Sequence, residues 1–335
     1  MSTADLVAGV MFAAVVLYAV LGGADFGSGA WDLLAGDARR GASTRRLIDH
    51  AIGPVWEANH VWLIFVLVFL WTGFPVPFAT LMRTLAVPFW LVGLGIVLRG
   101  AGFAFRKYAP TLRWARAAGV TFALSSLMTP FFLGMITGAI ASGRVGTGDD
   151  SSTAWLSPTS FLGGSLAVLT CTFLAGVFLS AEAQRIGDES LAESLRIKSL
   201  AVGAVTGIVA LVGIIPLRSD APTLSDGLVG RAAPLVLLSA IAGATTVWLL
   251  ARRKLRLARG SSAVAVAAIV IGWGVAQYPW ILVDQTTIED GAGAAATMTG
   301  LLIASGLAAV LVVPPLIYLF ILADTNRLGS GEGVD

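Results

Sequence analysis

Residues 53–70 read GPVWEANHVWLIFVLVFL, a short polar opening followed by an unbroken apolar run. The opening holds Glu57, Asn59 and His60, and from His60 to Leu81 no further acidic or basic residue interrupts the chain. A helix needs about 20 consecutive apolar residues to cross the roughly 30 Å hydrocarbon layer of a bilayer. Residues 60–81 therefore predict a transmembrane helix that begins beside three polar side chains.

Eight more runs of this kind occur along the chain, and the nine together define the fold. Of the 335 residues, 56% are hydrophobic and only 13% are charged. Soluble globular proteins carry roughly 25% charged residues, so a soluble domain is excluded. The expected fold is an all-α polytopic membrane protein, with one integral membrane domain over residues 1–335. The predicted spans are 5–23, 60–81, 84–104, 117–140, 160–181, 199–216, 231–251, 262–283 and 299–322.

The distribution of positive charge predicts the orientation of these spans. Cytoplasmic loops retain Lys and Arg during membrane insertion. With nine spans, 18 of the 22 basic residues fall on one side, and the other side holds only Arg83, Arg144, Arg218 and Arg231. The N-terminus is expected outside and the C-terminus in the cytoplasm. Because Met1 to Asp5 lacks Lys and Arg, the first run is interpreted as a mature helix instead of a signal peptide. Topology accounts for the basic residues, and no nucleic-acid partner is expected.

Ionisable residues near the cytoplasmic ends of the first three spans are the candidate functional groups. Charged groups at membrane depth are costly and usually line a pathway or meet a partner. The predicted topology places Asp25, Glu57, His60 and Arg99 at the same side of the membrane. Glu57 and His60 are three residues apart and share a helix face. Two interpretations stay open at this point: the group passes protons, or its ion pairs only hold three helix ends together.

Metal and haem ligands are scarce in this chain. It has two His, one Cys and six Met, and no spacing typical of a metal site. A haem held by two histidines needs them on facing helices, whereas His50 lies in a charged stretch ten residues before His60. We therefore expect no metal site and no haem ligated by this chain.

Several motifs resemble subunit II of the cytochrome bd quinol oxidases. Similarity extends over essentially the full length, and the second motif is the most specific. The motifs are GADFGSG (residues 23–29), GPVWEANHVWLI (53–64), RGAGFAFR (99–106), FLSAEAQR (178–185) and WGVAQYP (273–279).

This resemblance implies an architecture, a partner and a reaction. Family members have nine helices in two four-helix bundles plus one peripheral helix, and they pair with a haem-bearing subunit I that ligates haems b and d. The assembled enzyme oxidises quinol, reduces oxygen to water and takes its protons from the cytoplasm. A quinone bound in this subunit, a small single-helix subunit and surrounding lipid are further implied partners. The implied location is the cell membrane of a prokaryote.

The resemblance also assigns roles to individual residues. Asp25 and Glu57 match acids proposed for a proton route, and Arg99 matches a basic residue nearby; with His60 they form the expected proton pathway. Trp62 matches an aromatic residue near the proposed oxygen entrance, and the set expected to line that entrance or the subunit interface is Trp56, Asn59 and Trp62.

The chain departs from the family at two positions of this region. Gly22 and Ala104 stand where many members carry acids, so the proton route has fewer acids here. The alternative function is a proton-coupled secondary transporter that uses Asp25, Glu57 and Arg99.

Overall fold

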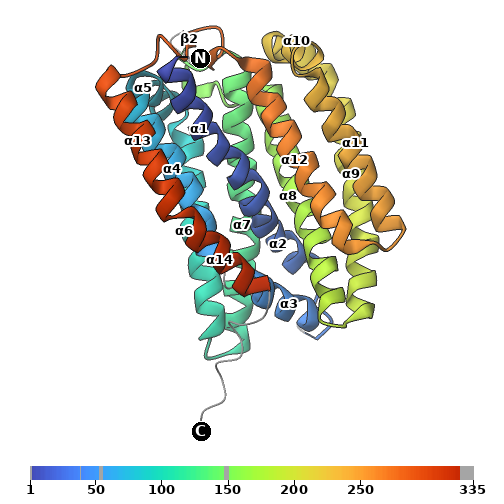
Figure 1. Ribbon diagram of the computed structural model, residues 1–335. Coiled ribbons are helices and arrows are strands. Elements are labelled where there is room, and N and C mark those ends of the chain that lie inside the picture. Colours follow the sequence, from blue (N-terminus) through green and yellow to red (C-terminus); the bar gives the residue numbers. More distant parts are fainter. Residues whose placement is uncertain (1, 38, 53–55, 147–150, 325–335) are drawn as a thin grey trace.

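The computed structural model describes residues 2–37, 39–52, 56–146 and 151–324, and nearly all of them are helical. Figure 1 shows the helices side by side in a bundle. The elements are α1 (Thr3–Leu17), η1 (Tyr18–Gly22), α2 (Gly23–Leu34), α3 (Ala42–Ile52), α4 (Trp56–Gly73), α5 (Pro75–Thr84), α6 (Ala86–Lys107), α7 (Leu112–Ala141), η2 (Ser151–Thr153), α8 (Pro158–Arg185), α9 (Glu189–Asp220), α10 (Pro222–Val229), α11 (Ala233–Ala251), α12 (Leu255–Gln277), β1 (Trp280–Leu282), β2 (Thr286–Thr287), α13 (Ala295–Leu311) and α14 (Val313–Asp324).

The helices confirm a multi-pass, all-α membrane protein. In the described ranges, eight helices are long and apolar enough to cross a membrane, and the bent pair α4–α5 raises the number to nine if it counts as one span. The N-terminus lies at the same end of the bundle as β2, α5 and α10, whereas α14 approaches the opposite end, near α3 (Figure 1). An odd number of crossings produces this arrangement. We refer to the second end as the α3 end.

The span predicted over 60–81 is interrupted in the structure. Helix α4 ends at Gly73, and α5 begins at Pro75 with its axis turned by 117°. Proline has no N–H to donate and disfavours a helical conformation in the residue before it, which here is Phe74 (φ −131°, ψ 62°). Helix α4 runs along the bundle, and α5 lies at the end that carries the N-terminus (Figure 1).

Two other predicted spans have different ends. The first, predicted over 5–23, continues through η1 and α2 to Leu34, so Asp25 lies inside a helix and not after one. The eighth, predicted to reach residue 283, stops at Gln277. Pro279 cannot continue the helix, and Trp280–Leu282 instead pairs with Thr286–Thr287 in a small antiparallel hairpin.

Helix α2 is the buried centre of the bundle because glycines let its neighbours approach closely. It packs between α7 and α8. A Cβ added at Gly27 would lie 1.9 Å from the carbonyl oxygen of Cys171, and one at Gly29 would lie 2.3 Å from Cβ of Ser126. Such close packing of backbones through small residues is typical of helices in lipid. Every polar side chain on α2 is consequently surrounded by protein.

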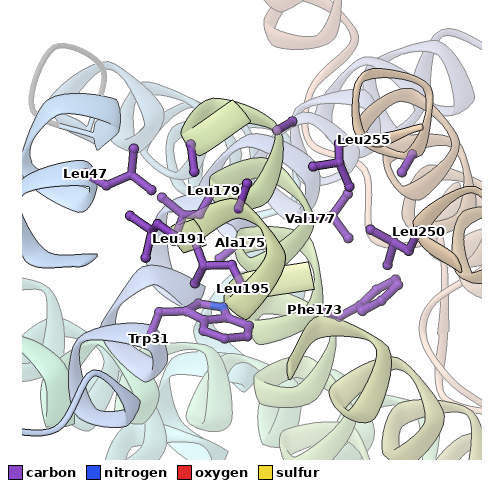
Figure 2. Close-up of a cluster of buried hydrophobic side chains, with 14 of the residues drawn as sticks. Trp31, Leu47, Phe173, Ala175, Val177, Leu179, Leu191, Leu195, Leu250 and Leu255 are labelled. Carbon is purple, nitrogen blue, oxygen red and sulfur yellow. The ribbon is translucent and has the colours of Figure 1, made fainter. Parts of the chain in front are cut away.

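A hydrophobic cluster anchors the α3 end of α2 to its neighbours (Figure 2). The Trp31 ring is 1% exposed, and its Nε1 donates a hydrogen bond of 2.9 Å to the carbonyl oxygen of Thr172 on α8. The cluster also takes in Leu47 from α3, Leu195 from α9 and Leu250 from α11. This cluster fixes the position of α2 along the bundle axis, and so the level at which its polar side chains meet α6 and α7.

Candidate functional site

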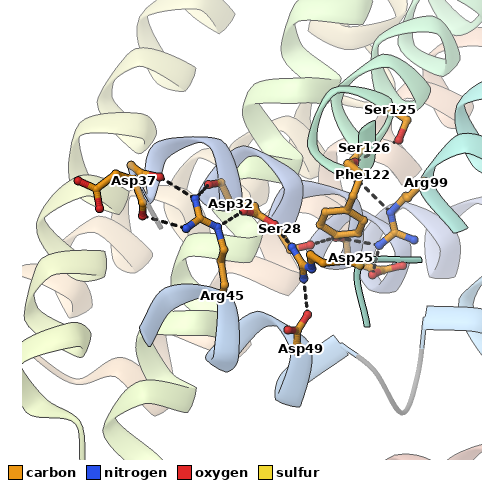
Figure 3. Close-up of polar contacts among 12 residues, drawn as sticks. Asp25, Ser28, Asp32, Asp37, Arg45, Asp49, Arg99, Phe122, Ser125 and Ser126 are labelled. Carbon is orange, nitrogen blue, oxygen red and sulfur yellow. Dashed lines mark hydrogen bonds and ion pairs between the residues drawn. The ribbon is translucent and has the colours of Figure 1, made fainter. Parts of the chain in front are cut away.

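The centre of the candidate site is an ion pair between α2 and α6. Nη2 of Arg99 lies 2.5 Å from Oδ1 of Asp25, and the exposed fractions are 1% for Arg99 and 3% for Asp25. The same guanidinium donates from Nε to Oγ of Ser126 on α7 at 3.1 Å. One arginine therefore ties three helices together inside the bundle (Figure 3).

Aromatic rings enclose the guanidinium on two sides. Cζ of Arg99 lies 5.0 Å from the ring centroid of Phe26 and 5.3 Å from that of Phe122. A cation within about 6 Å of a ring face is attracted by the ring quadrupole, more strongly where water is excluded. The rings and Asp25 together compensate the cost of burying this charge.

The second carboxylate oxygen of Asp25, Oδ2, does not share the ion pair with Arg99. Within the described residues, Oδ2 of Asp25 is buried and accepts no hydrogen bond of ordinary length, although the Asn59 side chain interacts with this carboxylate. Buried polar atoms almost always have partners, so an exception calls for a specific explanation. A carboxylate that is anchored through one oxygen and accepts no ordinary hydrogen bond at the other is able to take up a proton at the second oxygen without breaking its ion pair.

The irregular turn η1 brings α4 to this group. Residues Tyr18–Gly22 form a π-helical turn inside the first long helix, a feature that often occurs at functional sites. Nδ2 of Asn59 on α4 reaches the carbonyl oxygen of Leu21 in this turn at 3.5 Å. Nδ1 of His60 lies 3.4 Å from the Tyr18 hydroxyl, and its ring is 5.9 Å from that of Phe26. His60 and Arg99 therefore both contact the ring of Phe26.

A second set of ion pairs lies two turns further along the same helices. Asp32, 4% exposed, accepts from Nε of Arg45 on α3 at 2.7 Å and also pairs with Arg106 on α6. Arg106 reaches Asp49 on α3 as well. The Phe122 ring lies between the two sets, 5.3 Å from Cζ of Arg106 as it is from Arg99.

Sequence reasoning missed the second set, although its signal was present. Asp25 and Asp32 are seven residues apart, and so are Arg99 and Arg106. Seven residues are nearly two helical turns, so each pair lies on one face of its helix. Matching spacings of opposite charge on two neighbouring spans predict two stacked ion pairs.

Arg45 also closes the loop that follows α2. It donates to the carbonyl oxygens of Gly36 at 2.7 Å and Asp37 at 3.0 Å. Hydrogen bonds from the backbone N–H groups of Arg40 and Arg39 lower the pKa of the exposed Asp37 carboxyl. Residues at the α3 end are therefore held to the core by arginine side chains.

The structure brings together some of the predicted site residues and separates others. Asp25, Arg99, Asn59 and His60 form one group, but the Glu57 side chain is exposed on the surface of α4. Of the remaining predicted site residues, Trp62 is half-buried on α4, and the side chain of Trp56 lies outside the described residues. At the two positions that depart from the family, Ala104 is exposed on α6 and Gly22 ends η1.

The two histidines do not fit a shared haem. Nε2 of His50 lies 3.9 Å from Oε1 of Glu182 at the surface between α3 and α8, and half of the His50 side chain is exposed. His60 lies inside the bundle next to Tyr18. Within the described part of the chain, no group of three or more His, Cys, Asp or Glu side chains could hold a metal ion.

The fold has a counterpart among respiratory oxidases. It matches a chain in the structure of bd oxidase from Geobacillus thermodenitrificans with a TM-score of 0.81 and 26% sequence identity, over 96% of this chain and 98% of that one. The class of protein that the fold and the site define is thus a chain of a bd-type oxidase.

Sequence comparisons identify the subunit. The sequence profile of the family described as cytochrome bd terminal oxidase subunit II matches residues 3–323. The chain belongs to this family, which confirms the resemblance carried by the motifs.

Individual relatives match over shorter stretches. Identity is 31% over 131 residues with the cytochrome bd ubiquinol oxidase subunit 2 of Bacillus subtilis (strain 168), covering 38% of this chain and 39% of that protein. It is 28% over 126 residues with the cytochrome bd-I ubiquinol oxidase subunit 2 of Escherichia coli (strain K12), covering 38% of this chain and 32% of that protein. The chain spans about a third to two-fifths of the length of these relatives.

Proposed function

We propose that this chain is the haem-free subunit of a membrane complex that couples quinol oxidation to the reduction of oxygen to water. The match to a bd oxidase chain over nearly its full length carries this proposal. The two histidines, which lie apart on α3 and α4, support the assignment of haems b and d to a partner subunit I.

The proposal includes the arrangement of the complex in the membrane. Residues 1–335 form one membrane domain of two four-helix bundles and a peripheral helix, paired with subunit I in the plasma membrane of a prokaryote. The bias of Lys and Arg toward the α3 end supports a cytoplasmic location for that end. The complex also holds a bound quinone and a small single-helix subunit.

Purification of the tagged chain tests the assignment. From native membranes in mild detergent, we expect a haem-bearing membrane protein to co-purify in equal amount, with haem b and d absorbance and quinol oxidase activity. The control is the same chain expressed without the partner gene, which should yield protein without these bands. Isolation of a single-chain, haem-free transporter would contradict the proposal.

A proton route from the α3 end toward the partner is the second part of the proposal. Asp25 has one buried carboxylate oxygen that accepts no ordinary hydrogen bond within the described residues, and Arg99 holds the other. Glu57 is exposed in the first turn of α4, three residues before His60. His60 contacts the Phe26 ring, which also contacts the guanidinium of Arg99. A donor at the surface, a ring nitrogen and a buried acid provide groups that exchange protons by general acid–base chemistry. On the same helix, Asn59 and Trp62 line an oxygen entrance or the subunit interface.

Replacement of Glu57 by glutamine tests the first step of this route. Glutamine keeps the size of the side chain but cannot carry a proton, so we expect turnover per haem to fall by about a hundredfold, the lower end of general acid–base contributions. Oxygen consumption normalised to haem d absorbance measures it. Glu189→Gln is the matched control because Glu189 is also an exposed acid in the first turn of its helix. If E57Q lowers only the yield of complex, the residue serves the interface instead.

A further inference from the structure

The turn between α11 and α12 concentrates positive charge at the α3 end. Five basic residues occur between positions 252 and 259, and all five are exposed: Arg252, Arg253, Lys254, Arg256 and Arg259. The turn is tight, with Arg253 in a left-handed conformation (φ 59°), so the cations are held close together. In Figure 1 this turn joins two of the long helices of the bundle.

Three of these cations have no acidic partner among the residues that the structure describes. Arg253 lies 3.2 Å from Oε1 of Glu193, and Arg259 stacks on the ring of Phe178. Over the described ranges, Arg252, Lys254 and Arg256 have no ion pair with a carboxylate. Several other arginines toward this end of the molecule do have one: Arg45, Arg106, Arg185 and Arg196. The charge at the α11–α12 turn is therefore available to an anion from outside the chain.

An exposed apolar surface continues directly from these cations. Arg252 and Lys254 lie 5.7 and 6.0 Å from the ring of Trp248, which is itself half exposed. Ile241, seven residues before Trp248, shares its face of α11 and is also exposed. On α12, the exposed Leu257 and Val264 form a similar stripe. Both helices are candidate membrane spans, so the stripes run from the cations along two helices that are long and apolar enough to cross a membrane.

We propose that the α11–α12 turn binds an anionic phospholipid. Its phosphate would contact Arg252, Lys254 and Arg256, and its acyl chains would lie along the stripes that lead away from Trp248 and Leu257. Basic residues next to a membrane span attract anionic headgroups, and an aromatic residue with one polar edge suits the boundary between headgroups and chains. An acidic protein partner would use the cations but would not account for the apolar stripes that begin at the same residues. This site is separate from the Asp25–Arg99 group and does not depend on the proposed oxidase reaction.

Spin-labelled lipids test the site on the purified complex. The complex is reconstituted in phosphatidylcholine, and the motionally restricted fraction is measured for spin-labelled phosphatidylglycerol and for spin-labelled phosphatidylcholine. The wild type should prefer phosphatidylglycerol. A contact of about 1 kcal/mol per cation corresponds to about fivefold in affinity, so R252Q/K254Q/R256Q, which removes three contacts, should lower the affinity at the preferred site by about a hundredfold.

The control variant R39Q/R46Q/R113Q removes equal charge from exposed positions toward the same end. It should keep the preference, and unchanged haem absorbance shows that each variant is folded and assembled. The proposal is overturned if the wild type does not distinguish the two lipids, if both triple variants lose the preference equally, or if R252Q/K254Q/R256Q retains it.

Discussion

Replacement of Arg99 by glutamine is expected to destabilise the protein by about 3–5 kcal/mol, the usual cost of removing one partner from a buried ion pair. Asp25 would remain 3% exposed with a charge that no cation balances, and Ser126 would lose its bond to Arg99. The measurement is the free energy of unfolding of the purified complex in denaturant, together with the yield of haem-loaded complex.

A double-mutant cycle gives this prediction its control. Asp25→Asn together with Arg99→Gln removes both charges, so the double variant should be more stable than R99Q alone, because no uncompensated charge stays buried. Arg116→Gln, at an exposed position on α7, should leave stability unchanged. Equal destabilisation by R99Q and R116Q, or additive losses in the double variant, would contradict the ion pair.

The same variants separate the two interpretations that the sequence left open. If Asp25 only holds helices together, the double variant that assembles should turn over at the wild-type rate per haem. If Asp25 carries a proton, turnover should stay low even where stability is recovered. Oxygen consumption per haem and unfolding free energy therefore report on different properties of one residue.

The spans and the buried acids could be predicted from local sequence alone. Hydrophobic runs place the crossings because lipid excludes unpaired backbone polar groups, and Asp25 and Arg99 are conspicuous among apolar residues. The break at Phe74 could also be predicted from the sequence, because Pro75 cannot continue α4. Only the length of the 60–81 run concealed it.

Contacts that depend on packing were not accessible in this way. The first span was predicted to end at residue 23, but the chain continues as a helix through η1 into α2, which is enclosed by α7 and α8. Arg45 lies between the predicted spans 5–23 and 60–81, and its bond to Asp32 follows only from the position of α3 beside α2. The sequence suggested that Glu57 faces the other acids, whereas α4 turns it to the surface.

The second large effect is expected for Asp32→Asn. Asp32 balances Arg45 and Arg106 in a site that is 4% exposed, so its neutralisation should cost about 3 kcal/mol or more. The loss of stability should be confined to α3 and the loop before it, because Arg45 joins Asp32 to the carbonyl oxygens of Gly36 and Asp37 in that loop. We expect faster amide hydrogen exchange in residues 39–52, with α6 and α7 little affected.

Asp37→Asn is the matched control for this variant. Asp37 is an exposed acid five residues from Asp32, and asparagine can still accept the backbone hydrogen bonds from Arg39 and Arg40. It should therefore leave exchange in α3 unchanged. Because the Asp25–Arg99 pair is on the far side of the Phe122 ring, D32N should also keep more turnover per haem than D25N. Equal loss of turnover in the two variants would mean that both acids act in one route, and that the second ion-pair set is part of the path from the α3 end.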